Sequence, residues 1–403
     1  MLNFILHLFR KFRIGKSYIP FGRPSFTYKE IRAVKKVIKS GWIGMGSETI
    51  SFESDIKAFI GVPQVVCVNS CTSALFLALV AAGVADEDEV ICPSLTWCST
   101  ANVVFYAGAT PVFADIDPRT YLISFDSILS KITHRTKAVI VVHFGGLAVD
   151  VFELRRILPD NIIIIEDAAH AFGSKYIDGT MVGSSGNLTC FSFYANKNIS
   201  TGDGGAISLL NESLAEKIQS LRQNAMPINA WKRFTHSDSL LLSPNIKELG
   251  YKMNYTDINA ALGRIQLSRW NEMARHRRMI SEVYATHIRN SDIKVSLQEG
   301  VLEDGHSRHL FVVELNSDSS AQGQSRDDVI QKLRAKNIGA TLHYAPLHVM
   351  PLYISEGKIH SQNLPITEKV SKRILTLPIS ASISRGEAEY VVSNFIKVLS
   401  DEE

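Results

Sequence analysis

The sequence predicts an α/β protein whose large domain has a mainly parallel seven-stranded sheet flanked by helices, followed by a smaller C-terminal α+β domain. The chain has 403 residues, more than the roughly 250–300 at which a single core stops growing, so two domains are expected. Seven short apolar runs with helical patterns between them indicate strands that are buried on both faces. These runs are 65–68, 89–92, 110–113, 138–142, 162–165, 188–193 and 206–210.

Helix signals flank these runs. Thr27 and Glu30 form a capping-box pattern, and Gly41 ends the apolar periodicity that follows it. A second helix is expected at about 52–60. The stretch 256–289 predicts one or two long helices that join the large domain to the small one. The expected division is an N-terminal extension (1–18), a large domain (19–255), and a linking helix with the small domain (256–403).

The composition is that of an ordinary globular protein. Lys and Arg total 43 against 40 Asp and Glu, and 45% of the residues are hydrophobic, which excludes disorder, collagen and a disulfide miniprotein. A formal net charge of +3 does not favour nucleic acid as a partner. The five cysteines are an odd set within apolar runs and suggest reduced thiols in a cytoplasmic protein. No metal-binding spacing is present in the sequence, so no metal site is expected.

The N-terminal extension differs from the rest of the chain. Residues 1–40 contain ten Lys and Arg against the single acid Glu30, and residues 1–14 combine apolar and basic side chains at helical spacing. One interpretation is a short helix that makes peripheral contact with an anionic membrane surface. The other is an unstructured N-terminal extension or a misassigned start, because the segment is too short to span a bilayer.

The first candidate site follows the run 65–68. Ser70, Cys71, Thr72 and Ser73 precede a helical pattern, and a helix start with free backbone amides and hydroxyl donors favours an anion such as phosphate. Ligands in parallel sheets bind beyond the carboxyl ends of the strands, which is where this turn is expected. The alternative is ordinary N-capping, because Ser and Thr are the usual caps at any helix start, and for this turn alone it is the commoner explanation.

Asp167 and His170 follow the isoleucine run 162–165. A carboxylate at the end of a central strand is costly unless a cation pairs with it, and a protonated heterocyclic nitrogen of a cofactor would be such a partner. Capping of the next helix is the alternative role for Asp167. His170 is expected on the same side, where it would contact a bound ring or have a purely structural role.

Lys197 follows the run 188–193 and precedes three glycines within four positions, Gly202, Gly204 and Gly205. The glycines predict a tight backbone turn beside the lysine. A poorly hydrated lysine loses its proton easily and can bond covalently to a carbonyl cofactor, whereas an exposed lysine would not.

Taken together, these motifs resemble the DegT/DnrJ/StrS-type family of pyridoxal-phosphate-dependent sugar-nucleotide aminotransferases. The segment 191–205 (FSFYANKNISTGDGG) is similar to the family pattern F-S-F-H-x-x-K-x-x-x-x-G-E-G-G. Residues 166–171 (EDAAHA) resemble E-D-x-A-[QH]-A, and residues 70–75 (SCTSAL) resemble S-G-T-x-A-L. The resemblance covers about 19–395 and implies the aspartate aminotransferase fold, the fold type I of PLP-dependent transferases.

The resemblance implies roles for individual residues. Lys197 would carry pyridoxal 5′-phosphate (PLP) and act as acid and base, while Asp167 would hold the pyridine nitrogen. Cofactor contacts are further implied for Thr72, Ser73, Trp97, His170, Ser192, Lys252 and Asn254. The last two lie in the segment 250–258, which in the family reaches the neighbouring subunit's cofactor, so a homodimer with shared active sites is expected. Substrate contacts are suggested for Trp42, His343, Tyr344 and His348.

Several positions depart from the family pattern. Tyr194 stands where histidine is usual, Cys71 where glycine is usual, and Asp203 where glutamate is usual. Lys252 stands where asparagine is usual and Asn254 where arginine is, a variant that resembles the branch acting on 4-keto sugars in lipopolysaccharide modification. Either residue can be the phosphate contact.

The resemblance implies transfer of an amino group, from glutamate, to a keto group of a nucleotide-linked sugar for polysaccharide, lipopolysaccharide or other glycan biosynthesis. One alternative is a non-catalytic or regulatory protein of the same fold. Another is a PLP-dependent sugar dehydratase, in which histidine replaces the lysine, so Lys197 favours amination. Neither the nucleotide, UDP or dTDP, nor the aminated carbon follows from the sequence.

Overall fold

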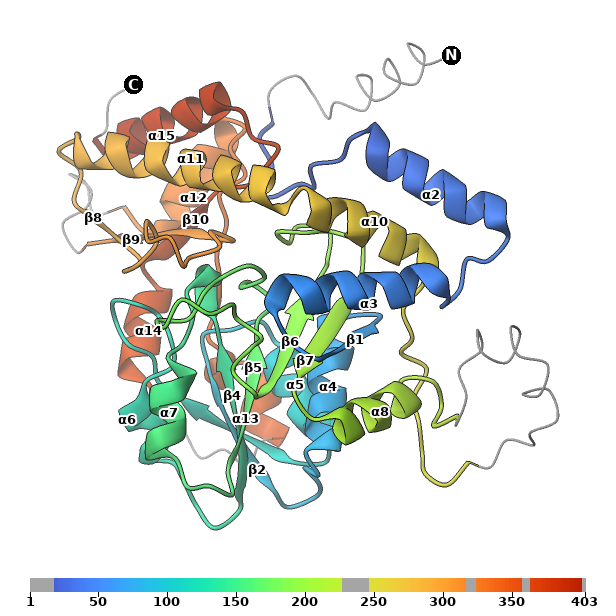
Figure 1. Ribbon diagram of the computed structural model, residues 1–403. Coiled ribbons are helices and arrows are strands. Elements are labelled where there is room, and N and C mark those ends of the chain that lie inside the picture. The colour runs from blue at the N-terminus through green and yellow to red at the C-terminus, as the bar shows by residue number, and fades with distance from the viewer. Residues whose placement is uncertain (1–17, 227–245, 317–323, 357–362, 401–403) are drawn as a thin grey trace.

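The computed structural model describes residues 18–226, 246–316, 324–356 and 363–400, and a seven-stranded sheet lies at its centre (Figure 1). The strand order is β1-β7-β6-β5-β4-β2-β3. Strand β7 is antiparallel to β1 and β6, and the remaining neighbours are parallel, so the predicted mainly parallel sheet is confirmed. The strands are β1 (Gln64–Val68), β2 (Glu89–Pro93), β3 (Thr110–Ala114), β4 (Thr136–Val142), β5 (Ile163–Asp167), β6 (Leu188–Ser192) and β7 (Gly205–Leu209).

Alternate residues of each strand face two different layers of helices. On β1, Val65 and Cys67 pack into a core with Phe52 and Ile56, whereas Val66 and Val68 pack into the core on the opposite face. The first core contains residues of α3 (Ser47–Ile60), α7 (Val151–Ile157) and the start of α11 (Trp270–Arg289). The second contains residues of α4 (Cys71–Ala81), α5 (Ser99–Tyr106) and α8 (Glu212–Leu221).

Helix α3 begins five residues before the expected start at Phe52. The backbone N–H groups of Gly46 and Thr49 donate to Asp257 Oδ1 at 2.7 and 2.9 Å, and the N–H of Glu48 donates to Oδ2 at 3.2 Å. Asp257 therefore acts as an N-cap from about 200 residues away, a contact that local periodicity does not reveal.

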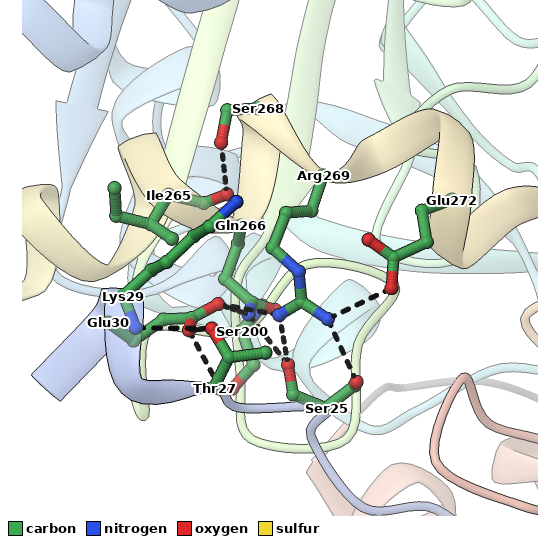
Figure 2. A network of polar contacts seen from close by, with 10 residues as sticks. All are labelled: Ser25, Thr27, Lys29, Glu30, Ser200, Ile265, Gln266, Ser268, Arg269 and Glu272. Atoms are coloured by element: carbon green, nitrogen blue, oxygen red, sulfur yellow. Dashed lines mark hydrogen bonds and ion pairs between the residues drawn. The ribbon is translucent and has the colours of Figure 1, made fainter.

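Helix α2 (Tyr28–Ser40) has the predicted capping box, and its Glu30 is buried (Figure 2). The Glu30 carboxylate accepts the Thr27 backbone N–H at 2.8 Å, Arg269 Nη1 at 2.7 Å and Gln266 Nε2 at 2.8 Å. Gln266 and Arg269 lie where α10 (Asp257–Ser268) meets α11. Gln266 also accepts the backbone N–H of Ser200 at 3.5 Å, so this network connects α2 to the loop that follows Lys197.

The expected stretch of one or two long helices is two, α10 and α11, which run one after the other across the molecule (Figure 1). Helix α10 packs against α2 and α3, whereas α11 packs against α15 (Arg385–Ser400). The division into 19–255 and 256–403 stays a prediction. The C-terminal part contains an antiparallel sheet of β8 (Val295–Leu297), β9 (Phe311–Leu315) and β10 (Ile374–Leu377).

The remaining elements are short or surround this second sheet. They are α6 (Phe125–Leu129), η1 (Phe144–Gly146), α12 (Arg326–Ala335), η3 (Leu347–Val349), α13 (Pro351–Glu356) and α14 (Pro365–Ser371). Within the described part of the chain, no helix combines the length and apolar character needed to cross a membrane. The expected membrane contact falls on residues 1–17, which lie outside the described residues.

Candidate active site

A cavity of about 460 Å³ lies beyond the carboxyl ends of β1, β5 and β6, where parallel sheets place their ligands. The turn after β1, the end of β5 and the loop after β6 meet there, as the sequence predicts. Eight of the predicted site residues line the cavity: Thr72, Trp97, Asp167, His170, Ser192, Lys197, His343 and Tyr344.

Asp167 is the buried acid of the cavity, with 5% of its surface exposed. Its Oδ2 accepts a hydrogen bond from Thr100 Oγ1 at 2.8 Å, and its Oδ1 accepts the backbone N–H of Ala169 at 3.1 Å. Burial raises the pKa of Asp167 above its ordinary value, and these hydrogen bonds with the nearby charge of Lys197 only partly offset that effect. A cation in the cavity would compensate the buried carboxylate.

Lys197 lies in the loop after β6 and lines the same cavity. Burial lowers the pKa of its amino group to about 8, although Cys71 and Asp167 act in the opposite direction. A substantial fraction of the amine is therefore uncharged near neutral pH and can attack a carbonyl carbon.

The turn before α4 has the geometry of an anion site. Ser70 is the N-cap of the helix and accepts the backbone N–H of Ser73 at 3.1 Å. Thr72 lines the cavity, and its hydroxyl donates to Ser99 Oγ at 2.9 Å. Gly205 passes so close to this turn that a Cβ there would lie 2.6 Å from the backbone of Ser70. The absence of a side chain lets the end of the Lys197 loop pack directly on the turn.

The two predicted phosphate serines lie differently. Ser192 lines the cavity, and its hydroxyl oxygen accepts the Tyr194 backbone N–H at 3.4 Å, which leaves its proton for a ligand. Ser73 lies behind the turn, because its hydroxyl donates to Asn69 Oδ1 at 2.6 Å and its backbone N–H is used by Ser70. The phosphate role of Ser73 stays a prediction.

His170 and Tyr344 form a hydrogen-bonded pair across the cavity. The Gly145 backbone N–H donates to His170 Nδ1 at 3.3 Å, so the neutral ring carries its proton on Nε2, which lies 3.0 Å from the Tyr344 hydroxyl. Burial and the charge of Lys197 lower the pKa of His170 well below its ordinary value. The Tyr344 hydroxyl therefore accepts from His170 and can donate its own proton to a ligand.

Aromatic rings surround this pair. The ring of Trp97 lies 5.9 Å from that of Tyr344, and the ring of His343 lies 4.9 Å from it. Trp97 is 60% exposed, so it lies at the entrance of the cavity. His343 is held by Thr376, whose Oγ1 lies 2.9 Å from Nδ1. Trp97 and His343 both line the cavity. The predicted contacts of Trp97 with a bound cofactor ring and of His343 with a substrate stay predictions.

Glu166, the residue before Asp167 on β5, is a second buried acid with hydrogen-bond partners of its own. Val149 N–H donates to His143 Nδ1 at 2.9 Å, so Nε2 carries the ring proton and donates to Glu166 at 2.8 Å. The hydroxyl groups of Tyr176 and Ser185 also donate to this carboxylate. Burial alone would raise the pKa of Glu166, but these hydrogen bonds outweigh it and lower the pKa. The charge of Glu166 is thus fully satisfied and does not compete for a ligand.

Two predicted substrate residues lie away from the cavity lining. The Trp42 indole donates to the backbone oxygen of Met45 at 3.0 Å. His348 is buried, with Nδ1 2.7 Å from Ser94 Oγ and Nε2 3.5 Å from Glu368. Their substrate contacts stay predictions.

Lys252 and Asn254 also lie outside the cavity of their own chain. Their segment runs beside β1, where the Asn69 backbone N–H donates to Met253 O at 3.1 Å and Asn254 bridges to Val68. Lys252 is exposed and Asn254 is half-buried. Their predicted contacts with the cofactor phosphate stay predictions.

Three residues of the site were missed by the sequence analysis. Thr100 donates a hydrogen bond to Asp167. His309 Nε2 lies 3.4 Å from Lys197 Nζ. Asn198 contacts the other ring nitrogen of His309, Nδ1. Asn198 lies within the segment 191–205 and Thr100 lies three residues after Trp97, so closeness in sequence to predicted site residues was the available signal. His309 lies more than 100 positions from Lys197, directly before β9, and nothing in its local pattern distinguishes it from a core histidine.

The donor set fits PLP. The buried carboxylate of Asp167, which has no ion pair within 4 Å among the described residues, suits the protonated ring nitrogen. Lys197 suits the aldehyde carbon, and the start of α4 with Thr72 and Ser192 suits the phosphate. The Asn196 Oδ1 atom is buried and has no hydrogen-bond partner in the described residues, so the cavity also retains an unused acceptor. Among the described residues, no group of three or more His, Cys, Asp or Glu could hold a metal ion.

Comparisons with known proteins agree with this geometry. The chain is 38% identical over 378 residues to the spore coat polysaccharide biosynthesis protein SpsC of Bacillus subtilis, covering 93% of this chain and 95% of the relative. The PLP form of the putative sugar aminotransferase Spr1654 from Streptococcus pneumoniae superposes with a TM-score of 0.85 at 30% identity, covering 96% and 100%.

A third similar protein is Helicobacter pylori PseC, an aminotransferase involved in the biosynthesis of pseudoaminic acid. It superposes with a TM-score of 0.85 at 25% identity, covering 95% of this chain and 99% of that one. The family model described as the DegT/DnrJ/EryC1/StrS aminotransferase family matches residues 24–396. The expected fold and the expected PLP cofactor are thereby confirmed. The chain belongs to the DegT/DnrJ/EryC1/StrS aminotransferase family, a family of PLP-dependent sugar aminotransferases.

Proposed function

We propose that this protein transfers an amino group from glutamate to a keto group of a nucleotide-linked sugar, releasing 2-oxoglutarate, in the cytoplasmic biosynthesis of a polysaccharide, lipopolysaccharide or other glycan. The observation that carries the proposal is that Lys197 and Asp167 line the same cavity. SpsC acts in spore coat polysaccharide biosynthesis and PseC in pseudoaminic acid biosynthesis, which supports an activated sugar as acceptor.

Each residue then has a defined task. When bound, PLP draws electron density from the substrate carbon that carries the nitrogen, so that its proton can leave. Burial lowers the pKa of the Lys197 amine to about 8. This amine would move the proton between the substrate carbon that carries the nitrogen and a carbon of the cofactor. With PLP bound, Asp167 would stabilise positive charge on the ring nitrogen, and Ser192 would donate its hydroxyl proton to the phosphate. Thr72 would do the same by turning its hydroxyl from Ser99 to the phosphate.

The other side of the cavity would position the sugar. The Tyr344 hydroxyl keeps a proton to donate because it accepts from His170, and the His343 ring lies beside it. A sugar hydroxyl or keto oxygen provides the acceptor that this donor requires. Trp97 at the entrance offers an apolar face for stacking.

The proposal includes a homodimer with shared sites. Lys252 and Asn254 do not line their own chain's cavity, and the resemblance places their segment at a neighbouring subunit's phosphate. A basic or amide side chain from the partner would complete the phosphate contacts of the α4 turn. The peripheral membrane contact of residues 1–18 is kept as a proposal that rests on their composition.

A substrate panel tests the proposal. The PLP-loaded protein is incubated with keto sugars linked to UDP or dTDP and with glutamate, and 2-oxoglutarate release is followed together with the mass of the aminated sugar. Alanine and aspartate replace glutamate in parallel reactions, and Lys197→Ala protein serves as the inactive control. Amination of at least one sugar nucleotide with glutamate is expected. Turnover with free amino acids and simple keto acids but with no sugar nucleotide would contradict it.

A further inference from the structure

His309 is a second ionisable group beside Lys197. Its Nε2 lies 3.4 Å from Lys197 Nζ, and its Nδ1 lies 3.2 Å from Asn198 Oδ1. Asn198 is in turn fixed by the donation of its Nδ2 to the backbone oxygen of Ser307 at 3.0 Å. His309 and Asn198 are both buried, so these contacts are shielded from bulk water.

This sequence of contacts fixes every proton in it. The Ser307 carbonyl accepts only, so the amide nitrogen of Asn198 must face it and the amide oxygen must face His309. That oxygen requires a proton on His309 Nδ1, which leaves Nε2 of the neutral ring as an acceptor. The neighbour of Nε2 is Lys197 Nζ, which as a free amine has a proton to donate in either protonation state. The geometry thus defines one direction of donation, from Lys197 to His309 to Asn198 to Ser307.

The groups around His309 keep it neutral. The ring of His170 lies 4.5 Å from the ring of His309, and Arg277, His343 and Lys197 also face it. Burial and the charge of Lys197, together with these groups, lower the pKa of His309 well below its ordinary value. His309 therefore stays a neutral acceptor at physiological pH. The charged groups that face Lys197 itself are Asp167 and Cys71, which act against the lowering of its pKa by burial.

We propose that His309 is a positioning residue for Lys197, and that Asn198 acts through it by fixing its tautomer. A lone pair directed at Nζ stabilises the protonated amine and restrains the side chain whenever the amine is not bonded to the cofactor. Without His309, burial would lower the pKa of Lys197 further, and the amine would hold its proton less firmly between the two proton transfers. The inference rests on the proposed function only in taking Lys197 as the reactive amine.

The test is the pH dependence of Lys197 labelling in the full-length protein freed of cofactor. Trace labelling with acetic anhydride from pH 6 to pH 10, followed by peptide mass spectrometry, gives the pH at which half of Lys197 is reactive. Exposed Lys217 on α8 is the internal standard, whose profile should be the same in every variant. Because neither PLP nor a sugar is present, the result is independent of whether the proposed reaction occurs.

In the wild type the midpoint is expected near pH 8. His309→Leu keeps the bulk but removes the acceptor, and we expect the midpoint to fall by about one pH unit. His309→Gln offers an amide oxygen near the Nε2 position and should restore at least half of the shift. An unchanged midpoint in His309→Leu, or equal shifts in both variants, would overturn the proposal.

Asn198 provides the second test. Asn198→Ala should lower the midpoint in the wild type and have no effect in His309→Leu protein, because its influence passes through the imidazole. Equal effects in both backgrounds would remove Asn198 from the proposal. If either leucine or alanine variant does not fold, ring-nitrogen NMR of the wild-type chain decides instead. A His309 signal with Nδ1 protonated and no titration from pH 6 to pH 9 supports the proposal, and an Nε2-protonated or titrating ring contradicts it.

Discussion

At the scale of single residues, the cavity combines an acid that burial makes hard to ionise with an amine that burial makes easy to deprotonate. Asp167 and Lys197 have pKa values displaced toward their neutral forms for the same physical reason, the loss of water around a charge. Such displaced pairs are typical of active sites and are costly in a purely structural core. In the proposed arrangement, the ring nitrogen of bound PLP would supply the compensating positive charge.

The variant Asp167→Asn tests how much the buried, ionised carboxylate destabilises the cofactor-free protein. We expect turnover to fall at least about 100-fold, because the amide cannot hold a proton on the ring nitrogen. The cofactor-free variant should melt at a higher temperature than the cofactor-free wild type at pH 7, because a raised pKa means that the ionised carboxylate destabilises the folded state. The Thr100 hydroxyl can reverse its hydrogen bond to serve the amide.

The direction of the pKa shift determines the pH range in which the wild type and Asp167→Asn differ in stability. Below the unfolded pKa of an aspartate, both states are protonated and the ionisation term vanishes. The destabilisation of the wild type grows as the pH rises from the unfolded pKa to the raised folded pKa, and it is constant above that. Calorimetry between pH 4 and pH 8 measures it. Asp160→Asn, at an exposed position before β5, is the matched control and should change neither property. A cofactor-free Asp167→Asn protein that melts below the wild type would contradict the account.

At the scale of secondary structure elements, buried polar contacts between distant segments determine where helices begin and how loops are held. Asp257 sets the start of α3, and Glu30 connects α2 to the α10–α11 junction and to the loop after Lys197. Local sequence predicts the capping box at Thr27 but not these partners, because the contacts join residues between 66 and 239 positions apart. These contacts between distant segments could not be predicted from local sequence patterns.

Glu30→Gln should destabilise the protein by about 3 kcal/mol, because it leaves the charge of buried Arg269 without its main partner. Urea unfolding measures the change. Although burial opposes ionisation of Glu30, its hydrogen bonds from Thr27 and Arg269 outweigh this and lower its pKa below 4.5. The stabilisation is therefore present at neutral pH and is lost as the pH falls through that lowered pKa.

Glu272→Gln is the matched control for Glu30→Gln. Glu272 pairs with the same arginine at 3.4 Å, but its side chain is 65% exposed, and it should contribute less than about 0.5 kcal/mol. If both variants lost a similar free energy of unfolding, burial would not be what distinguishes the Glu30–Arg269 pair from the Glu272–Arg269 pair.

Gly205→Ala tests the contact between the Lys197 loop and the α4 turn. A Cβ at this position would lie 2.6 Å from the Ser70 backbone and 2.7 Å from the Cys71 nitrogen, so the turn must move. We expect PLP affinity to fall at least about tenfold, because the amides at the start of α4 shift away from the phosphate. Absorbance titration with PLP measures it. Gly44→Ala, where a Cβ meets nothing within 4 Å, should bind like the wild type, and equal affinities in both variants would refute the packing argument.

At the scale of the whole molecule, much of the fold and the site was predictable because it follows from short-range patterns. The strands, the mainly parallel sheet and the positions of Asp167, Lys197 and the α4 turn were predicted from apolar runs and the residues that follow them. The antiparallel direction of β7 was not, because strand periodicity does not encode direction. His309 was not predicted because only tertiary packing brings it to Lys197.

Mixing of inactive variants tests the shared site. A protein with Lys197→Ala is combined with one carrying Lys252→Ala and Asn254→Ala, and dimers are re-formed from equal amounts. If each site takes Lys197 from one chain and residue 252 or 254 from its partner, one site per mixed dimer is intact, and roughly a quarter of the wild-type activity returns.

The matched control mixes Lys197→Ala with Asp167→Asn protein. These residues line the same chain's cavity, so each site of the mixed dimer lacks one of them and no activity should return. Recovery in the control, or none in the test mixture, would contradict the shared arrangement.

The most direct measurement of the central claim is chemical reduction of the PLP-loaded protein with borohydride, followed by proteolysis and mass spectrometry. The account predicts a phosphopyridoxyl group on Lys197, the lysine of the loop after β6, and on no other residue. A modification on a different lysine, or the absence of any modification in protein shown to contain PLP, would contradict it.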